Sequence, residues 1–531
     1  MPQLSLCLIV RDEAAMLPDF LAATRDLRDE FIAVDTGSRD RTAALLTEAG
    51  ATVIRFPWQD DFAAARNRAL QAATGQWVLI LDADERPRPE LVAEIRTVTQ
   101  DPTIGAATLR MRNQLPHGHI RESDLLRLWR HDAAIAFEHA IHEDASRSVL
   151  LTLQRDGRRL VNLAGLCDHL GYVREVAAGR DKKDRDLALL RRCLERDPDD
   201  WYSWLKLMEQ ARFWRDQALW RDTARQVVQR LDGPPPAVLP AAPWTGELLA
   251  LAARGLFPDP ADQVDWLDRW ADRVPPSPAF FVQRGLSLER AGKLDRAHAD
   301  FQRCRDLPAG TLPMHTTVRP LLGLCRVAAQ RGDLLTAGDC VHQALTFAPR
   351  DPEALLAAVS FAWLNGGLEA RDGFVREHRL AYGDSRELTL ALGDHALQVG
   401  LWDEAAAVLA PAAEGEPHGR AHLMLAQCRL AQGQCRLARD LCRELMASLP
   451  EAGMGYLTCS LALGEPVEFS VDLDEGKANA AFKTWIRILW RSRQAQLMTT
   501  FVDHHGLVLG IFPWLSEFLT AETQKLAART R

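Results

Sequence analysis

The chain has 531 residues, of which 47% are hydrophobic and 26% are charged, and its formal net charge is −8. This length predicts two or three domains, and the composition is typical of a globular protein. Because the net charge is negative and no basic tract is present, we do not expect a nucleic-acid partner.

Targeting signals and cysteine spacing bear on the compartment. No apolar run approaches the roughly 18 residues that a membrane-spanning helix needs, and the start of the sequence lacks a basic segment followed by a cleavage site. The ten cysteines contain no Cys-x-x-Cys pair, so neither a zinc knuckle nor a secreted disulfide framework is indicated. We therefore expect a cytoplasmic protein with reduced thiols and no transmembrane segment.

Short apolar runs alternate with helical stretches in the first hundred residues. The runs predict four buried strands: Leu4–Val10, Phe31–Val34, Ala51–Phe56 and Trp77–Leu81. Helices are expected from Glu13 to about Leu27, over 39–49 and 62–73, and from the Pro87/Pro89 region through Arg96. Ser38 is the expected N-cap of the second helix, and Gly50 suits its C′ position. This alternation predicts parallel βαβ units.

Acids follow three of the four predicted strands: Asp12 and Glu13, then Asp35, then Asp82 and Asp84. In a parallel sheet these strand ends share one edge, so the carboxylates should converge on one crevice. Strand-to-helix turns also favour Asp and Ser as caps, which is the simpler interpretation.

The pair in Leu81-Asp82-Ala83-Asp84-Glu85 is the strongest of these signals. If the strand geometry continued that far, Asp82 and Asp84 would point the same way. Two hard oxygen ligands suit Mg²⁺ or Mn²⁺ bridging to substrate phosphates, whereas a bare Asp-x-Asp on its own is more often a solvated turn. There is no glycine-rich phosphate loop, so phosphate charge would have to be met by a metal or by Arg and Lys.

Several blocks of sequence resemble family 2 glycosyltransferases, and in particular the subgroup that joins this domain to tetratricopeptide repeats and includes sublancin-type bacteriocin S-glycosyltransferases. The blocks are Leu6–Glu13, Val34–Thr42, Trp58–Asn67, Leu79–Glu85, Leu125–Arg130, Phe137–Glu143 and Asp168–Tyr172. The resemblance implies a GT-A fold, which is a Rossmann-like α/β domain with a mostly parallel sheet. It also implies a divalent metal, Mn²⁺ or Mg²⁺, and a nucleotide-diphosphate sugar as donor, with a UDP-sugar preferred.

The same resemblance assigns expected roles to individual residues. Asp84 would hold the metal, and Asp82 would contact the metal or the nucleotide. The nucleotide would also be bound by Asp35 at the base, by Arg66 at base or phosphate, and by Glu13. Glu143 is the expected general base, with Glu138 and Asp144 as competitors, and His142 is expected as a third metal ligand or a phosphate contact.

Histidines nearby raise the question of a further metal site. His139-x-x-His142 lacks the H-E-x-x-H pattern of a zinc site, and we interpret His119 and His131 as ordinary surface residues. The role of His169 stays open, because family members often have an aromatic residue where Leu170 stands.

Glycines recur with a nearly fixed period after residue 279. Gly292, Gly332, Gly366, Gly400 and Gly433 are separated by 40, 34, 34 and 33 residues. Five residues after each glycine is an alanine, except at Arg371, and Pro308, Pro349, Pro417 and Pro450 lie 16 or 17 residues after four of them. This pattern predicts an all-α tetratricopeptide-repeat solenoid.

The predicted domains are therefore a GT-A domain over 1–180, a connecting helix over 181–196, repeats over 197–464 and a helical cap over 465–531. The Pro- and Trp-rich segment 232–278 is expected to be an irregular insertion. The repeats either dock a peptide, protein or glycan acceptor, mediate a homo-oligomer, or serve only as a scaffold. The cap contains Trp485, Trp490, Phe512 and Trp514, and its His504-His505 pair is expected to be structural.

The function expected from these features is inverting, metal-dependent sugar transfer. One alternative is a tetratricopeptide adaptor whose glycosyltransferase-like domain is inactive, but its expected sign, a broken Asp-x-Asp, is absent. A second alternative is nucleotidyl or phosphoryl transfer, which lacks its usual glycine-rich loop and second acidic metal cluster.

Overall fold

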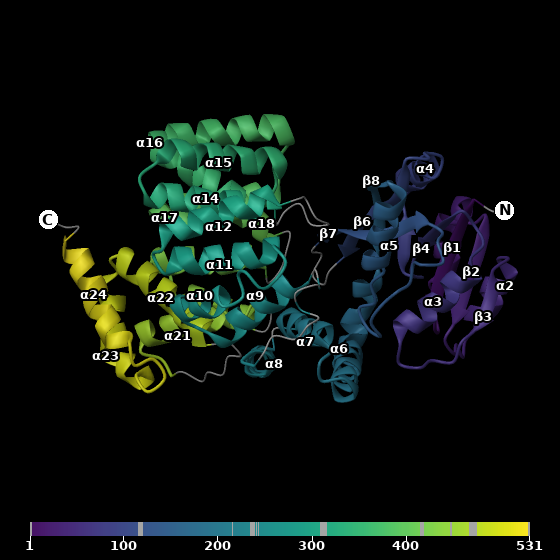
Figure 1. Cartoon of the computed structure of the whole chain (residues 1–531). Coiled ribbons are helices and arrows are strands. Elements are labelled where there is room, and N and C mark those ends of the chain that lie inside the picture. Colours follow the sequence, from purple (N-terminus) through teal and green to yellow (C-terminus); the bar gives the residue numbers. More distant parts are fainter. Residues whose placement is uncertain are drawn as a thin grey trace. The chain divides into compact units, whose positions relative to one another are not determined.

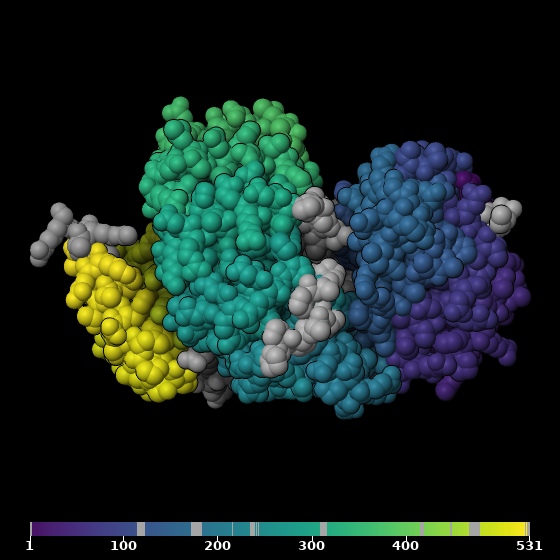
Figure 2. Space-filling view, viewed as in Figure 1, coloured from purple at the N-terminus to yellow at the C-terminus, as the bar shows by residue number. Residues whose placement is uncertain are grey.

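The computed structural model of the chain describes residues 3–114, 120–214, 216–233, 239, 242, 244–307, 316–414, 419–446, 449–466 and 475–528. The chain divides into two units, residues 1–252 and 253–531. Each unit is built around its own apolar core, and the coloured atoms of each pack closely in the space-filling view (Figure 2). Pro308, Pro417 and His119 lie outside the described residues.

The first unit contains one eight-stranded sheet of order β3-β2-β1-β4-β7-β6-β8-β5. Strands β1 to β4 are mutually parallel, as the sequence predicts, whereas β7 runs antiparallel between β4 and β6. The sheet lies in the purple-to-blue part of the chain (Figure 1). The strands are β1 Leu4–Val10, β2 Glu30–Asp35, β3 Thr52–Arg55, β4 Trp77–Ile80, β5 Glu85–Pro87, β6 Ile104–Gln114, β7 Ile120–Arg130 and β8 Arg159–His169.

Helices cover both faces of this sheet because its buried strands are apolar on both sides. On one face Leu4, Leu6 and Leu8 of β1 join a core with side chains of α1 and α4. On the other face Cys7 joins a core with side chains of α3 and α5. These helices and their neighbours are α1 Leu17–Ala23, η1 Arg25–Leu27, α2 Thr42–Glu48, α3 Phe62–Ala72, α4 Pro89–Val98 and α5 Ser146–Asp156.

Two local predictions in this unit are wrong. The second helix, α2, begins at Thr42 with Arg41 at its N-cap, because Ser38 instead accepts a hydrogen bond from the backbone N–H of Asp12 at 3.0 Å. The connecting helix, α6 Gly171–Arg196, begins about ten residues before Asp181. The prediction for Gly50 is confirmed, since it follows the C-cap Ala49 with φ +84°.

The first unit continues with helices beyond the sheet. They are α7 Trp201–Phe213, α8 Gln217–Leu231 and most of α9 Thr245–Leu256. The segment 232–278 is therefore not irregular throughout, because α9 and α10 Pro260–Asp268 lie within it. Their apolar residues, among them Leu248, Leu249 and Val264, are fully buried, and Asp259 caps α10 by accepting from the N–H of Ala261.

The second unit consists of paired helices with the predicted period. Helices α14, α16, α17 and α19 begin at residues 318, 352, 386 and 420, which are 34 residues apart. The helices of this unit after α10 are α11 Pro278–Arg290, α12 Leu294–Asp306, α14 Val318–Gln330, α15 Leu334–Phe347, α16 Pro352–Tyr382, α17 Arg386–Val399, α18 Trp402–Glu414, α19 Arg420–Ala431, α20 Cys435–Leu445, α21 Ala452–Leu463, α22 Glu475–Arg491, α23 Ala495–His504, η4 His505–Val508 and α24 Leu515–Ala528.

The repeat glycines occupy the turns with one exception. Four of them have φ between +72° and +87°, the left-handed region that favours glycine. In the third repeat Gly367, with φ +62°, takes this role, while the predicted Gly366 has φ −165°. Arg371, at the alanine position of that repeat, is buried and forms a salt bridge of 2.6 Å with Glu404.

The C-terminal helices close one end of the repeat core. Phe482, Trp485 and Phe512 are buried in one cluster with residues of α19, α20 and α21, as expected of a cap. The Nδ1 atom of His504 lies 2.8 Å from the carbonyl oxygen of Thr500, which belongs to the same helix. This contact supports the local structure.

All ten cysteines of the chain are free; eight are buried and two are half-buried. Among the described residues, no helix is long and apolar enough to span a membrane.

Candidate active site

A cavity of about 510 Å³ lies at the carboxyl ends of the central parallel strands. Val10, Arg11 and Glu13 reach it from the end of β1, Thr36 from the end of β2, and Asp82 and Asp84 from the end of β4. This is the edge at which ligands bind in open α/β sheets. Of the strand-end acids that the sequence singles out, Glu13, Asp82 and Asp84 line this cavity, whereas Asp12 and Asp35 are outside its described lining.

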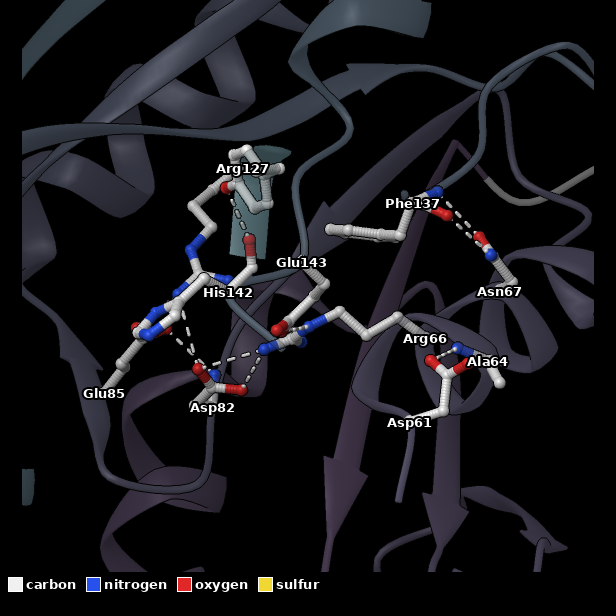
Figure 3. A network of polar contacts seen from close by, with 11 residues as sticks. Asp61, Ala64, Arg66, Asn67, Asp82, Glu85, Arg127, Phe137, His142 and Glu143 are labelled. Carbon is white, nitrogen blue, oxygen red and sulfur yellow. Dashed lines mark hydrogen bonds and ion pairs between the residues drawn. The ribbon is translucent and has the colours of Figure 1, made fainter. Parts of the chain in front are cut away.

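Arg66 of α3 lies between two of the candidate acids. Its Nη2 donates to Asp82 at 2.9 Å, and its Nε donates to Glu143 at 2.5 Å (Figure 3). The Arg66 side chain is only 6% exposed, and that of Glu143 is 14% exposed. Because both ion pairs are largely out of water, each charge depends on its partner for stability.

Arg127 of β7 extends this network from the other side. Its Nη2 lies 3.3 Å from Asp82 and 3.0 Å from Glu85. Its Nε is buried and has no hydrogen-bond partner among the described residues. A buried donor left in this state suits an ordered water.

Burial and charge act in opposite directions on the acids of this network. Burial alone would raise the pKa of Asp82, but the charges of Arg66 and Arg127 outweigh it and hold that pKa well below its usual range. For Glu85, which is 1% exposed, burial dominates and raises the pKa to about 7. Glu85 also accepts a hydrogen bond from the backbone N–H of Asp82 at 2.9 Å, so it holds the turn that carries the Asp-x-Asp pair.

That turn changes the expected geometry of the acid pair. Strand β4 ends at Ile80, and the backbone N–H of Glu85 donates to the carbonyl of Asp82 at 3.0 Å. The strand alternation therefore does not extend to Asp84. Asp82 faces the two arginines, whereas Asp84 lies 3.4 Å from His169, measured between Oδ2 and Nε2.

The sheet topology explains why His169 meets Asp84. After Asp84 the chain enters β5, which pairs with β8 in the register Glu85 to His169. The Nδ1 of His169 also lies 2.7 Å from Oδ1 of Asn113. Burial alone would lower the pKa of His169, but the hydrogen bond to Asp84 and the nearby carboxylates raise it overall.

The segment that carries Glu143 is held against α3. The side-chain amide of Asn67 donates to the carbonyl of Phe137 at 2.9 Å and accepts from the backbone N–H of Phe137 at 2.7 Å (Figure 3). The backbone N–H of Phe62 donates to the carbonyl of Ala140 at 2.8 Å. Glu143 and His142 line the cavity.

The two competitors for the role of base lie elsewhere. Glu138 and Asp144 are outside the set of described residues that line the cavity. Glu138 forms an exposed pair with Arg147 at 3.2 Å, and Asp144 accepts hydrogen bonds from Ser146. Among the three acids of this segment, Glu143 is the one placed at the cavity.

Asp35 and Glu13 differ in their placement. Glu13 lines the cavity. The Asp35 carboxylate, 6% exposed, accepts hydrogen bonds from the N–H groups of Gly37 and Ser38 at 3.1 and 2.8 Å. Its neighbour Thr36 is the residue of this strand end that faces the cavity.

Part of the cavity wall was not predicted. Arg185 and Asp186 of α6, and Gln210, Phe213 and Trp214 at the end of α7, line it together with Trp58 and Phe62. No local motif marks the residues of α6 and α7 as site residues, and only their position in the fold reveals them. The aromatic content near residue 214 is the one signal that the sequence offers.

Metal binding depends on the donor set. Among the described residues, no three acids, histidines or cysteines form a ready-made metal cluster. Asp84 offers a carboxylate, which suits Mn²⁺ or Mg²⁺, and the imidazole of His169 is a second donor 3.4 Å from it. A cation that relies on one or two protein ligands and on substrate phosphates fits this arrangement.

Comparison with known proteins agrees with this architecture. Residues 5–150 match the family model described as Glycosyl transferase family 2. A TPR repeat-containing protein of Synechococcus elongatus is 41% identical over 209 residues, which cover 39% of this chain and 52% of that protein. The glycosyltransferase SunS of Bacillus subtilis is 26% identical over 148 residues, which cover 27% of this chain and 35% of SunS.

Among solved structures, glucosyl-3-phosphoglycerate synthase from Mycobacterium tuberculosis has 19% sequence identity and a TM-score of 0.26, covering 32% of this chain and 72% of that one. The chain spans about half the length of the first of these curated relatives and about a third of the second. Residues 5–150 therefore match family 2 glycosyltransferases, and helix pairs with the 34-residue period of tetratricopeptide repeats come later in the chain. In this combination the chain is similar to the sublancin-type subgroup that includes SunS.

Proposed function

We propose that the chain is an inverting, metal-dependent glycosyltransferase that uses a nucleotide-diphosphate sugar, with a UDP-sugar preferred. The observation that carries the proposal is the convergence of Asp82, Asp84 and Glu143 on one cavity in a family 2 domain. An inactive adaptor would have no need to keep these acids together at one cavity.

The charge of the cavity wall supports a metal. Of the described residues, four arginines and five acids line it: Arg11, Arg66, Arg127, Arg185, Glu13, Asp82, Asp84, Glu143 and Asp186. If its histidines are neutral, this wall has no excess positive charge with which to balance the negative charge of a diphosphate. Asp84 and His169, with Asp82 nearby, would hold the cation. Bound there, a divalent cation would stabilise the negative charge of the leaving diphosphate.

The residues of the chain then divide the remaining work. The acceptor oxygen or sulfur forms a bond to the anomeric carbon of the donor sugar, and the bond from that carbon to the diphosphate oxygen breaks. The proton of the acceptor passes to the carboxylate of Glu143. Arg66 and Arg127 line the cavity and place positive charge beside the site, where it would stabilise the developing charge of the diphosphate. Direct displacement of this kind inverts the anomeric configuration.

A screen for donor hydrolysis tests the proposal. The purified full-length chain is incubated with UDP-, GDP- and dTDP-sugars, each with Mn²⁺, with Mg²⁺ or with excess EDTA. We expect slow, metal-dependent release of one nucleoside diphosphate. Absence of hydrolysis and of binding for all of these donors would contradict the proposal.

We propose that the repeats bind the acceptor, and that the acceptor is a peptide, a protein or a glycan. Leu335 of α15 and Leu380 of α16 are 85% and 88% exposed, and we propose these side chains as contacts for the acceptor. Replacing both with serine should raise KM for the acceptor without changing donor hydrolysis. If KM is unchanged, these side chains do not dock the acceptor. The same sample in analytical ultracentrifugation tests for a homo-oligomer.

A further inference from the structure

Helix α7 holds the segment of Glu143 from outside the region that matches the family model, which ends at residue 150. The hydroxyl of Tyr202 donates to the carbonyl of His142 at 2.9 Å. The ring of Tyr202 also stacks on that of His139, with centroids 3.6 Å apart and planes inclined by 15°. His139 and His142 both have positive φ, +70° and +55°, so this backbone is strained and needs such support.

The side chain of His142 is held by a relay of hydrogen bonds. The Nε1–H of Trp214 donates to Oε1 of Gln210 at 2.9 Å, and Nε2 of Gln210 lies 3.0 Å from Nε2 of His142. An indole N–H can only donate, so the oxygen of the Gln210 amide must face Trp214. The amide NH₂ is then the end that faces His142.

This orientation determines the proton on the imidazole. Because the Gln210 amide donates, Nε2 of His142 must accept and cannot carry a hydrogen in the neutral ring. The proton of neutral His142 therefore lies on Nδ1. Burial also lowers the pKa of His142, which favours the neutral form. His142 lines the cavity, and the N–H that its neutral ring can donate is consequently that of Nδ1.

We propose that Gln210, oriented by Trp214, is a positioning residue that fixes His142 as the Nδ1–H tautomer and so makes it a hydrogen-bond donor to a phosphate oxygen of the nucleotide. In this state the lone pair of Nε2 is occupied by Gln210, so His142 neither binds the metal through Nε2 nor takes a proton there. That the acceptor of this hydrogen bond is a nucleotide phosphate rests on the proposed function, whereas the tautomer of His142 rests on the geometry alone.

The tautomer is tested by two-dimensional ¹H–¹⁵N correlation spectra of full-length protein labelled with ¹⁵N-histidine. The signals of His142 are assigned by their loss in H142Q. We expect them to show a protonated Nδ1 and an unprotonated Nε2 in the wild type. A wild-type Nε2–H would overturn the proposal, whether or not the protein is active.

Variants of the relay separate positioning from general structure. Gln210→Glu replaces the donor with an acceptor, so Nε2 of His142 should become protonated, and kcat/KM for the donor should fall at least tenfold. Trp214→Phe removes only the N–H that orients Gln210, and a smaller loss with mixed tautomers is expected. Gln226→Glu on α8, a half-exposed glutamine bonded to Asp222, is the matched control and should change neither readout.

UDP with Mg²⁺ is the ligand probe. Adding UDP and Mg²⁺ should shift the Nδ1–H signal of His142 in the wild type. It should not change which ring nitrogen carries the proton. An unshifted signal while UDP binds by calorimetry would overturn the phosphate contact. If UDP does not bind, GDP and dTDP take its place, and if none of the three binds, the proposed function fails together with that contact, while the tautomer is still decided by the spectra of the free protein.

Discussion

Arg66 and Glu143 are 77 positions apart in the sequence, yet Nε of the arginine lies 2.5 Å from Oε1 of the glutamate. The same guanidinium also binds Asp82, so one buried cation joins the acid after β4 to the acid of the segment after β7. The candidate base and the candidate donor-binding acid are thus parts of a single electrostatic network.

Removing Arg66 should destabilise the first unit. In Arg66→Met two acids lose their buried partner, and breaking a buried pair in this way costs about 3 kcal/mol of unfolding free energy. Hydrogen exchange of the β1 and β4 amides measures the loss. Arg41→Met is the control, since the Arg41–Glu48 pair is 73% and 64% exposed and should contribute less than about 0.5 kcal/mol. In Arg66→Met with Glu143→Gln, part of the loss should be recovered; no recovery would contradict the coupling of the two residues.

Glu143→Gln should abolish transfer and leave donor binding intact. The amide oxygen can still accept from Nε of Arg66, but the side chain can no longer take the proton of the acceptor. We expect kcat for transfer to fall by about a hundredfold or more, with the Kd for UDP from calorimetry unchanged. Glu138→Gln, outside the cavity, should behave as wild type. A parallel loss of UDP affinity would place Glu143 in the nucleotide site instead.

Asp84→Ala tests the metal. Turnover should fall at least about a hundredfold, because the charge of the leaving diphosphate is no longer compensated. The unfolding free energy should change by less than about 1 kcal/mol, since the Asp84 side chain is partly exposed. Glu90→Gln, an exposed acid at the start of α4, is the control. Full activity of Asp84→Ala, or of the wild type in excess EDTA, would exclude the metal mechanism.

Two glycines of the second unit should respond in opposite directions to alanine. A Cβ on Gly455 of α21 would lie 2.4 Å from Cζ2 of the buried Trp485, so Gly455→Ala should destabilise the cap by about 1–3 kcal/mol. Gly373 in α16 has nothing nearer than the end of the Arg376 side chain at 3.9 Å. Gly373→Ala should therefore stabilise by up to about 1 kcal/mol through helix propensity. Thermal unfolding of both variants gives the comparison, and equal shifts would refute it.

Local patterns predict much of this fold. Leu4–Val10 matches β1 in full, and the 34-residue spacing predicts the helix pairs of the second unit. These features follow from apolar periodicity and turn glycines, which act over a few residues. The prediction of Ser38 as a cap is wrong because the partner of its hydroxyl, the N–H of Asp12, lies 26 positions away.

The candidate site is predictable only in part, for the same reason. The acids at the strand ends are visible because a parallel sheet collects its carboxyl ends on one edge. The pairing of Asp84 with His169 depends on β5 crossing to β8, and the relay from Trp214 to His142 depends on how α7 packs. Neither has a signature in the local sequence, since both are set by tertiary packing.

The distribution of the thiols gives this chain an internal reporter. Cys7, Cys167 and Cys193 belong to the first unit and the other seven to the second, and none of the ten is exposed. A pulse of a thiol-alkylating reagent should therefore modify the eight buried cysteines only when their surroundings open, whereas the half-buried Cys193 and Cys325 can also react in the folded state. Mass spectrometry of the modified peptides would follow the opening of the two units separately in one sample, without any engineered label.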